Sequence, residues 1–221
     1  MEFDEVVRTC FSCREFTDAP VTDAQLFALL DVARYAPSGG NRQGWRVVIV
    51  RDPHTKAELR ACAEPALRVY VAQQAAGESP WNTVHPTAVD VDERWNADEP
   101  VRFLKFLDAA PVLIVVGVDL GVVASFDKDH DRVGVISGAS IYPFAWNILL
   151  AARNMGMAGA LTTMCVGLEQ RAQQAVGFDR NTAVAAVLPL GWPRTQLTKL
   201  SRKPVESFVA MERWGGPPLA P

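Results

Sequence analysis

The chain has 221 residues, of which 49% are hydrophobic and 21% are charged. This length and apolar content are sufficient for a buried core, so we expect one domain over residues 1–221. The formal net charge of −3 argues against a protein that coats nucleic acid or an anionic membrane surface. We therefore expect neither a nucleic acid nor a membrane as a partner.

The start of the chain and its cysteines indicate a cytoplasmic protein. Residues 1–5 are acidic, whereas a secretory signal begins with basic residues. The longest apolar run, residues 109–118, is about half the length of a membrane-spanning helix, so we expect a buried strand there. The four cysteines are too few for a disulfide framework. They are Cys10, Cys13, Cys62 and Cys165.

The first clear helix signal follows Thr22. Thr22 and Gln25 have the spacing of a capping box, apolar residues then recur at helical spacing, and Pro37 marks the end. Residues 36–44 have the composition of a loop, and residues 45–50 read as a strand. We therefore expect a helix, a Gly-rich loop and a strand in succession.

A second helix is expected after a capping box at Thr55 and Glu58. Pro65 predicts a break in this helix, which then resumes to about residue 74. A short helix over residues 101–107 is expected to lead into the apolar strand.

Residues 77–100 lack a helical or strand period but carry Trp81, Trp95 and a cluster of acidic residues. An unpatterned segment of this length inside a domain is usually functional or mobile. We therefore interpret residues 77–100 as a lid insert with Trp81 and Trp95 near a substrate. The alternative is that both tryptophans pack on the body of the domain.

The C-terminal half contains the longest apolar pattern. Residues 133–155 are apolar on nearly every side, which predicts a long helix buried partly against a partner chain. Two further strands are expected at residues 158–164 and 183–190, with a helix at 168–176 between them.

Two motifs suggest metal or redox chemistry, but each lacks a required part. Cys10 and Cys13 have no βαβ context and no second pair, so we expect two cysteines on a helix. Asp127, Asp129 and Asp131 resemble the start of a calcium loop, but the required glycine and glutamate are replaced by Arg132 and Gly138. We expect Asp129 or Asp131 to cap the following helix instead. The histidines are expected on the surface, and no metal site is expected; they are His54, His85 and His130.

The loop at residues 37–43 has the composition of a ligand-binding segment. Gly39 and Gly40 allow the backbone to approach a ligand, while Asn41 and Gln43 supply amide donors and acceptors suited to a flat heterocycle. Taken alone, a plain loop is an equal alternative. Arg14 and Arg202 are arginines of the kind that bind phosphate.

Five motifs in this order closely resemble the FMN-dependent nitroreductase family over residues 3–210. They are Ser12-x-Arg14-x-Phe16-Thr17, Ala36-Pro37-Ser38-Gly39-Gly40-Asn41-Arg42-Gln43-x-Trp45, the run from Asn147 to Arg153, Gly156-x-x-Gly159 with Thr162-Thr163, and Leu190-Gly191-Trp192 with Arg202-Lys203-Pro204. The resemblance implies an α+β fold with a central, mostly antiparallel sheet flanked by helices. It also implies an intertwined homodimer with two FMN sites at the subunit interface.

The resemblance further implies which residues contact FMN. Ser12, Arg14 and Arg202 would face the phosphate and ribityl chain, and Lys105 the ribityl chain or pyrimidine edge. The backbone of Thr162, Thr163 and Met164 would lie beside the ring edge and donate to its reactive nitrogen. The other subunit would contribute Pro37, Ser38, Gly39, Asn41 and Gln43.

The chain departs from the family pattern immediately before Ser12. The family has one or two arginines there, and this chain has Cys10 and Phe11. Arg8 could replace the missing arginine, but it lies two residues earlier and would approach the phosphate from a different side of the helix. The substitution Cys10→Arg is therefore expected to tighten phosphate binding.

The implied activity is that of an oxidoreductase. Electrons would pass from NADH or NADPH to FMN and then to an organic acceptor, such as a nitroaromatic or a quinone, with ping-pong kinetics. Flavin carries such chemistry, so no catalytic side chain is expected. One alternative is a protein that binds and sequesters flavin with little turnover. Another is a family member that uses a different reductant, such as a reduced deazaflavin.

Overall fold

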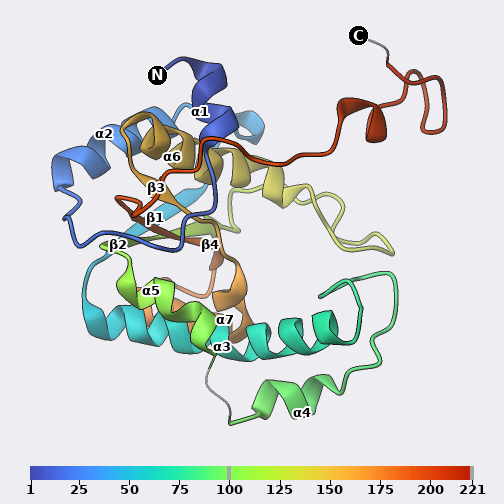
Figure 1. The fold of residues 1–221 in the computed structure, drawn as a ribbon. Helices are drawn as coiled ribbons and strands as arrows, with labels where there is room; N and C mark the ends of the chain where they lie inside the picture. The colour runs from blue at the N-terminus through green and yellow to red at the C-terminus, as the bar shows by residue number, and fades with distance from the viewer. Residues whose placement is uncertain (99–100, 220–221) are drawn as a thin grey trace.

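The computed structural model describes residues 1–98 and 101–219. Its centre is a four-stranded antiparallel sheet with the strand order β1-β2-β4-β3. The strands are β1 (Trp45–Val50), β2 (Val112–Asp119), β3 (Ala158–Gly159) and β4 (Thr182–Gly191). Helices lie on both faces of this sheet (Figure 1). The expected antiparallel sheet flanked by helices is confirmed.

The helices divide into two groups, one on each face. One face carries α1 (Phe3–Thr9), α2 (Asp23–Ala33) and α6 (Tyr142–Asn154). The other carries α3 (Pro53–Ala75), α5 (Lys105–Ala109) and α7 (Glu169–Val176), with α4 (Val91–Asn96) packed on α3. Short 3-10 helices cover Gly39–Asn41, Arg102–Leu104, Ser137–Ser140, Met164–Leu168 and Val205–Ser207.

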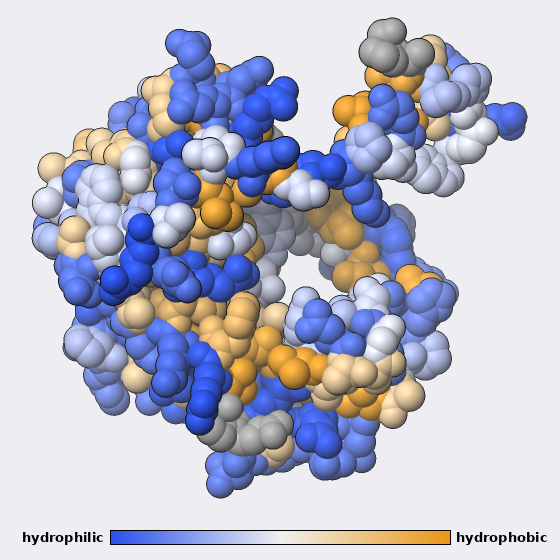
Figure 2. All heavy atoms as spheres, viewed as in Figure 1, coloured by the Kyte–Doolittle hydropathy of each residue, from blue (hydrophilic) through white to orange (hydrophobic). Residues whose placement is uncertain are grey.

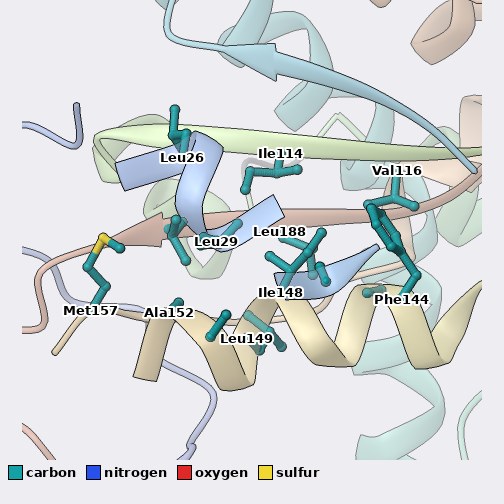
Figure 3. Close-up of a cluster of buried hydrophobic side chains, with 14 of the residues drawn as sticks. Leu26, Leu29, Ile114, Val116, Phe144, Ile148, Leu149, Ala152, Met157 and Leu188 are labelled. Atoms are coloured by element: carbon teal, nitrogen blue, oxygen red, sulfur yellow. The ribbon is translucent and has the colours of Figure 1, made fainter. Parts of the chain in front are cut away.

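Strand β2 is buried on both faces and connects the two cores. Successive side chains of a strand point to opposite faces, so Ile114 and Val116 face α2 and α6, whereas Leu113 and Val115 face α3, α5 and α7. Figure 3 shows Ile114 and Val116 with α2 and α6 side chains in the first of these cores. The expected buried strand is confirmed.

Helix α2 begins as the sequence predicts. The Thr22 hydroxyl accepts a hydrogen bond from the Gln25 N–H, and the Gln25 side chain accepts one from the Thr22 N–H. Leu26 and Leu29 are then buried against the sheet. The capping box sets the start of the helix, and its apolar face sets the direction of burial.

Helix α3 differs from the expectation at its start and at Pro65. Asp52, and not Thr55, is the N-cap: its carboxylate accepts the Thr55 N–H at 2.7 Å, with Pro53 in the first turn. The helix continues through Pro65 without a break. Pro65 is itself buried in a helix packed along one side of the sheet, and this tertiary packing offsets the backbone hydrogen bond that proline cannot make.

The predicted long helix at residues 133–155 is much shorter. Residues 133–136 are irregular, a 3-10 helix follows, and α6 begins only at Tyr142. Gly134 and Gly138 weaken helix formation in the first part, and Pro143 fits the first turn of α6. One face of α6 is buried in the core, while Tyr142 and Trp146 remain 44% and 42% exposed. The helix is therefore not buried on every side within this chain.

Two other expectations about regular structure are corrected. The strand predicted at residues 158–164 is reduced to β3 and an isolated bridge between Thr162 and Val187. The insert contains a helix, α4, whose N-cap Asp90 accepts the Glu93 N–H. Helix α4 has six residues, fewer than two helical turns, and is therefore too short for a helical period to show in the sequence. Glu99 and Pro100, the last two residues of the predicted insert, lie outside the described residues.

The aspartates expected to cap the long helix lie instead in a loop organised by Asp127. Asp127 is fully buried by its own loop, where its carboxylate accepts the Val135 N–H and an Arg132 N–H, both at 2.8 Å. Asp129 and Asp131 are exposed and cap no helix, since α6 starts ten or more residues later. The hydrogen bond from Val135, with a smaller contribution from Arg132, lowers the pKa of Asp127.

Asp127→Asn is expected to destabilise the protein at pH values above the titration range of the Asp127 carboxyl group. Below that range the substitution should have little effect. Because folding lowers the pKa of Asp127, its stabilising contribution is complete above the unfolded-state pKa and is lost as the pH falls through the folded-state value. Thermal unfolding of both proteins from pH 7 to pH 3 should show a difference that narrows below about pH 4. The matched control Asp129→Asn, at an exposed position, should behave as wild type; a constant difference for Asp127→Asn across the whole pH range would contradict this account.

The C-terminal segment leaves the body of the molecule. The Gln196 side chain still donates to the Thr9 carbonyl, but the chain then runs outward to a short hairpin (Figure 1). Its large apolar side chains are exposed, including Phe208 at 56% and Trp214 at 81%. None of the described helices combines the length and the apolar character that crossing a membrane requires.

Candidate functional site

The segment carrying Ser12 is attached to the short edge strand β3. Ser12 forms a parallel bridge with Gly159, and the Cys13 N–H donates to the Gly159 carbonyl at 2.9 Å. Gly159 has no room for a side chain, because a Cβ there would lie 2.6 Å from the Pro189 carbonyl oxygen. The Ser12 hydroxyl is exposed and has no hydrogen-bond partner within the described chain. It is therefore free to bind a ligand.

Arg14 and Lys105 lie on neighbouring segments. The Arg14 guanidinium is 5.2 Å from the ring centre of Phe103 and 5.7 Å from that of Phe106, the two residues that flank Lys105 and its neighbour Leu104. These cation–π contacts direct the arginine toward the start of α5. Arg14 and Lys105 are both exposed, so the structure gathers two cations and the Ser12 hydroxyl at one end of the molecule. We call Ser12, Arg14 and Lys105 the N-terminal cluster.

The loop at residues 37–43 is held in an unusual backbone conformation. Gly40, Asn41 and Gln43 all have positive φ, at 60°, 52° and 51°, a region that side chains disfavour. The Ser38 hydroxyl accepts the Gln43 N–H at 3.0 Å, and the Gly39 N–H donates to the Ser140 hydroxyl at 3.1 Å. Ser38 therefore braces the loop from within, while Pro37, Asn41 and Gln43 are exposed. Strained loops of this kind are concentrated at functional sites.

This loop and the N-terminal cluster lie at opposite corners of the sheet. The loop precedes Trp45, which pairs with Val118 and so lies level with Ala183, whereas Gly159 beside Ser12 lies level with Leu190 on the far edge. With strands that rise about 3.3 Å per residue and lie about 4.8 Å apart, the separation is on the order of 25 Å. One chain therefore does not bring the two sets of predicted residues together.

The Thr162–Met164 segment presents free backbone donors. Thr162 is held to β4 by a pair of hydrogen bonds with Val187, at 2.8 and 3.0 Å. The next residue, Thr163, is exposed, and its N–H has no acceptor among the described residues. The Met164 N–H makes only a long contact of 3.4 Å with the Thr162 hydroxyl. The segment is thus fixed at one end and open to a ligand at the other.

A cavity of about 570 Å³ lies against Thr163 and Met164, and the two predicted lid residues form part of its wall. Its lining residues are Ala66, Trp81, Trp95, Tyr142, Thr163, Met164, Val166, Gly167, Val184 and Ala185. In Figure 2, hydrophobic side chains gather around a hollow in the face shown. We call this cavity the tryptophan cavity.

The two tryptophans are fixed by the body of the domain. Trp81 has a φ of 54°, which is rare for a bulky residue, and two hydrogen bonds to α3 hold it there: its N–H donates to the Gln73 side chain and its indole N–H to the Ala66 carbonyl. Trp95 rests on Gly167, where a Cβ would come within 3.0 Å of its ring. The tryptophans therefore pack on the body and also line the cavity, so the two alternatives considered from the sequence are compatible.

A β-bulge shapes the floor of the tryptophan cavity. The register between β2 and β4 shifts after Val116, which leaves Ala185 as an extra residue. The Tyr142 hydroxyl donates to the Ala185 carbonyl at 3.4 Å, and both residues also line an adjoining cavity of about 470 Å³. Sequence reasoning missed Tyr142, Ala185 and Gly167 because bulges and close contacts depend on non-local pairing.

Another cavity of about 780 Å³ lies between α3, α4 and residues 101–103, and its lining contains none of the predicted cofactor residues. Most of its charged side chains serve internal contacts: Arg68 contacts Glu64, Arg94 contacts Glu93, and Asp90 caps α4. We therefore place the candidate site at the tryptophan cavity.

The structure does not bring Arg202 to the N-terminal cluster through any described contact. Arg202 lies on the outward-running C-terminal segment, and among the described residues the one acceptor of its guanidinium is the neighbouring Ser201 carbonyl. Its predicted role in phosphate binding remains a prediction.

The cysteines differ from the expected helical pair. Cys10 ends α1, and Cys13 lies in the extended segment beyond it. All four cysteines are buried and free, and burial raises the pKa of the Cys10 and Cys13 thiols. Thiols of this kind are poor nucleophiles and poor metal ligands at neutral pH. The described residues contain no group of histidines, cysteines or acids able to hold a metal ion.

Comparison with known proteins identifies the family. The family model described as the Nitroreductase family matches residues 7–192. The chain belongs to the Nitroreductase family. Iodotyrosine deiodinase 1 from Pongo abelii is 27% identical over 218 residues, covering 95% of this chain and 68% of that protein.

Two solved structures of the family share the fold. NADPH:FMN oxidoreductase from Vibrio harveyi, complexed with NAD+, has a TM-score of 0.68 at 19% identity, covering 96% of this chain and 77% of that one. An iodotyrosine deiodinase bound to FMN and 3-iodo-L-tyrosine has a TM-score of 0.67 at 20% identity, covering 96% and 100%. Because both identities are 20% or lower, the similarity to these two structures shows a shared fold and nothing further.

Proposed function

We propose that the protein is an FMN-dependent oxidoreductase that transfers electrons from NADH or NADPH to an organic acceptor. The observation that carries this proposal is the free Thr163 N–H at the wall of a cavity lined by two tryptophans. A preorganised donor beside a flat apolar cavity suits a ring whose charge changes during reaction. Membership of the Nitroreductase family supports the same chemistry.

The residues present fit FMN. Ser12, Arg14 and Lys105 offer a hydroxyl and two cations for a phosphate and a polyhydroxylated chain. Thr162, Thr163 and Met164 would lie along the ring edge, with the Thr163 N–H as the donor. When bound, FMN supplies the reversible uptake and release of two electrons.

The same arrangement supports a homodimer. Pro37, Ser38, Gly39, Asn41 and Gln43 lie too far from the N-terminal cluster to share one small ligand with it in a single chain. A second chain can supply the missing loop, as in a site formed across a two-fold axis. The exposed apolar residues Trp146, Phe208 and Trp214 support such an association, with the C-terminal segment and Arg202 placed on the partner.

In this proposal the side chains bind and orient, and none reacts. Trp81 and Trp95 exclude water from the cavity and hold a flat acceptor by stacking. The reductant and the acceptor occupy the cavity in turn, which gives ping-pong kinetics. The insert acts as a fixed cover, since the N–H groups of Trp81 are bonded to α3.

The decisive experiment is anaerobic addition of NADH or NADPH to the purified yellow protein. Loss of the flavin absorption within seconds, and its return when a nitroaromatic or a quinone is added, is the expected result. A flavin that neither nicotinamide reduces would instead favour a sequestering protein, and reduction only by a reduced deazaflavin would change the reductant.

Reductive deiodination is the second candidate, because the iodotyrosine deiodinase relative aligns with 95% of this chain. It would use the same FMN site with a halogenated aromatic acceptor. Iodide release from 3-iodo-L-tyrosine by the dithionite-reduced protein tests it directly.

Arg14→Ala is expected to weaken FMN binding by about 1.5–3 kcal/mol, the range of a hydrogen bond to a charged group. Arg14 is exposed, and its described contacts are two cation–π contacts and a long hydrogen bond of 3.4 Å to the Ser12 carbonyl, so the melting temperature of the flavin-free protein should change little. Titration of the apoprotein with FMN measures the effect. Arg180→Ala, at an exposed position on the turn before β4, is the matched control; equal FMN affinity in both variants would remove Arg14 from the site.

A further inference from the structure

The tryptophan cavity is built from uncharged side chains. Its described lining consists of apolar residues together with the hydroxyl groups of Tyr142 and Thr163. The nearest arginine on α3, Arg68, is 12% exposed and directs its guanidinium to Glu64 and to the Trp95 carbonyl. A ligand in this cavity therefore meets aromatic and aliphatic surface and a few neutral polar atoms.

The two indoles provide a recognition surface for a flat ring. Their centres are 6.4 Å apart and their planes meet at 89°, so they form two perpendicular walls. A planar ligand can stack on one indole and direct its own edge at the face of the other, and these are the two favoured aromatic geometries. The hydrogen bonds of Trp81 to α3 and the contact of Trp95 with Gly167 hold both walls in place.

We infer, resting on the proposed function, that this cavity selects uncharged planar acceptors and rejects the same ring when it carries a carboxylate or an amino-acid group. A charged group buried here would lose its water without gaining a counter-charge from the described lining. The deiodinase structure holds 3-iodo-L-tyrosine, which carries both an ammonium and a carboxylate group. On this inference the chain is specialised away from amino-acid substrates, which counts against 3-iodo-L-tyrosine deiodination as the second candidate function, and Trp81 and Trp95 are the residues that determine specificity.

Helix α4 adds to the discrimination against anions. Asp92 and Glu93 are exposed in its first turn, and the helix also carries Trp95. Glu93 is paired with Arg94, and the remaining negative charge on the helix that carries Trp95 lowers the local concentration of anionic acceptors. The effect weakens with salt, whereas the cost of burying a charge in the cavity does not, so the two contributions are separable by ionic strength.

The test uses the purified flavin-loaded protein and three ligands that share one ring: 4-nitrotoluene, 4-nitrobenzoate and 4-nitro-L-phenylalanine. Dissociation constants come from quenching of tryptophan fluorescence in the oxidised protein, without turnover. The neutral ligand is expected to bind at least about tenfold more tightly than either charged one, at low and at high salt. Equal affinities for the three ligands would overturn the inference.

Variants assign the preference to the cavity. Val166, 40% exposed in the lining, is replaced by arginine or, as the control, by glutamine. Val166→Arg should reduce the gap between 4-nitrotoluene and 4-nitrobenzoate several-fold, and Val166→Gln should not. Trp81→Ala and Trp95→Ala should each weaken 4-nitrotoluene binding about tenfold while FMN content is kept. A neutral preference that survives unchanged in all these variants would place it outside this cavity.

These outcomes are distinct from those of the proposed function. A protein that carries no FMN after reconstitution fails the proposed function, which the flavin absorption reports separately from ligand binding. A protein with full FMN content that binds charged and neutral rings alike overturns only the specificity.

Discussion

Gly159→Ala is expected to destabilise the protein strongly and to disrupt the candidate site at the same time. The added Cβ would lie 2.6 Å from the Pro189 carbonyl oxygen and 3.0 Å from a Leu149 methyl group. A backbone oxygen of β4 cannot move aside without opening the β3–β4 pair, and the N–H of Ala160, directly after β3, donates to that same oxygen. The loss should be about 3 kcal/mol, or roughly 6–12 °C in melting temperature for a chain of this size.

The effect on FMN should follow from the same contact. Ser12 bridges to Gly159, and the Cys13 N–H donates to the Gly159 carbonyl, so displacement of β3 displaces the N-terminal cluster. Thermal unfolding and FMN titration of one protein sample measure both effects. Gly134→Ala is the matched control, because its Cβ would be 3.5 Å from the nearest atom, an ordinary contact. A variant with a wild-type melting temperature would show that β3 can shift without cost.

Cys10→Arg is expected to destabilise the protein, which replaces the expectation that it tightens phosphate binding. Cys10 is only 6% exposed and belongs to the core beneath α6, with its thiol 3.7 Å from the Leu149 carbonyl. An arginine there would overfill the core. It would also bury a positive charge close to Arg153, whose own positive charge is near enough to oppose the rise that burial causes in the pKa of the Cys10 thiol. The loss should be about 3 kcal/mol or more.

Phe11→Arg is the informative comparison for the family arginines. Phe11 is half-buried at the surface of the second core, so an arginine there can extend into solvent beside Ser12. We expect a smaller loss of stability, about 1 kcal/mol, together with tighter FMN binding. If Cys10→Arg kept the wild-type melting temperature and bound FMN more tightly, the side chain at position 10 would face the ligand and not the core.

The sequence by itself determined those elements whose signals are local. The Thr22–Gln25 capping box fixes the start of α2, and the apolar run of β2 fixes a strand buried on both faces. The motifs around Ser12 and the loop at residues 37–43 identified the family, which the match over residues 7–192 confirms. Each of these depends on neighbours within a few residues, so the printed order of the amino acids is sufficient.

Only the tertiary structure decided the features that depend on distant contacts. Helix α3 continues through Pro65 because packing along the sheet outweighs one missing backbone hydrogen bond, and residues 133–141 are not helical although their composition is apolar. The inward direction of Cys10, the conformation of Trp81 and the bulge at Ala185 follow from partners 8 to 139 residues away in the chain. The free energy of such contacts belongs to the assembled core and not to any local run of residues, and for that reason periodicity and capping signals do not reveal them.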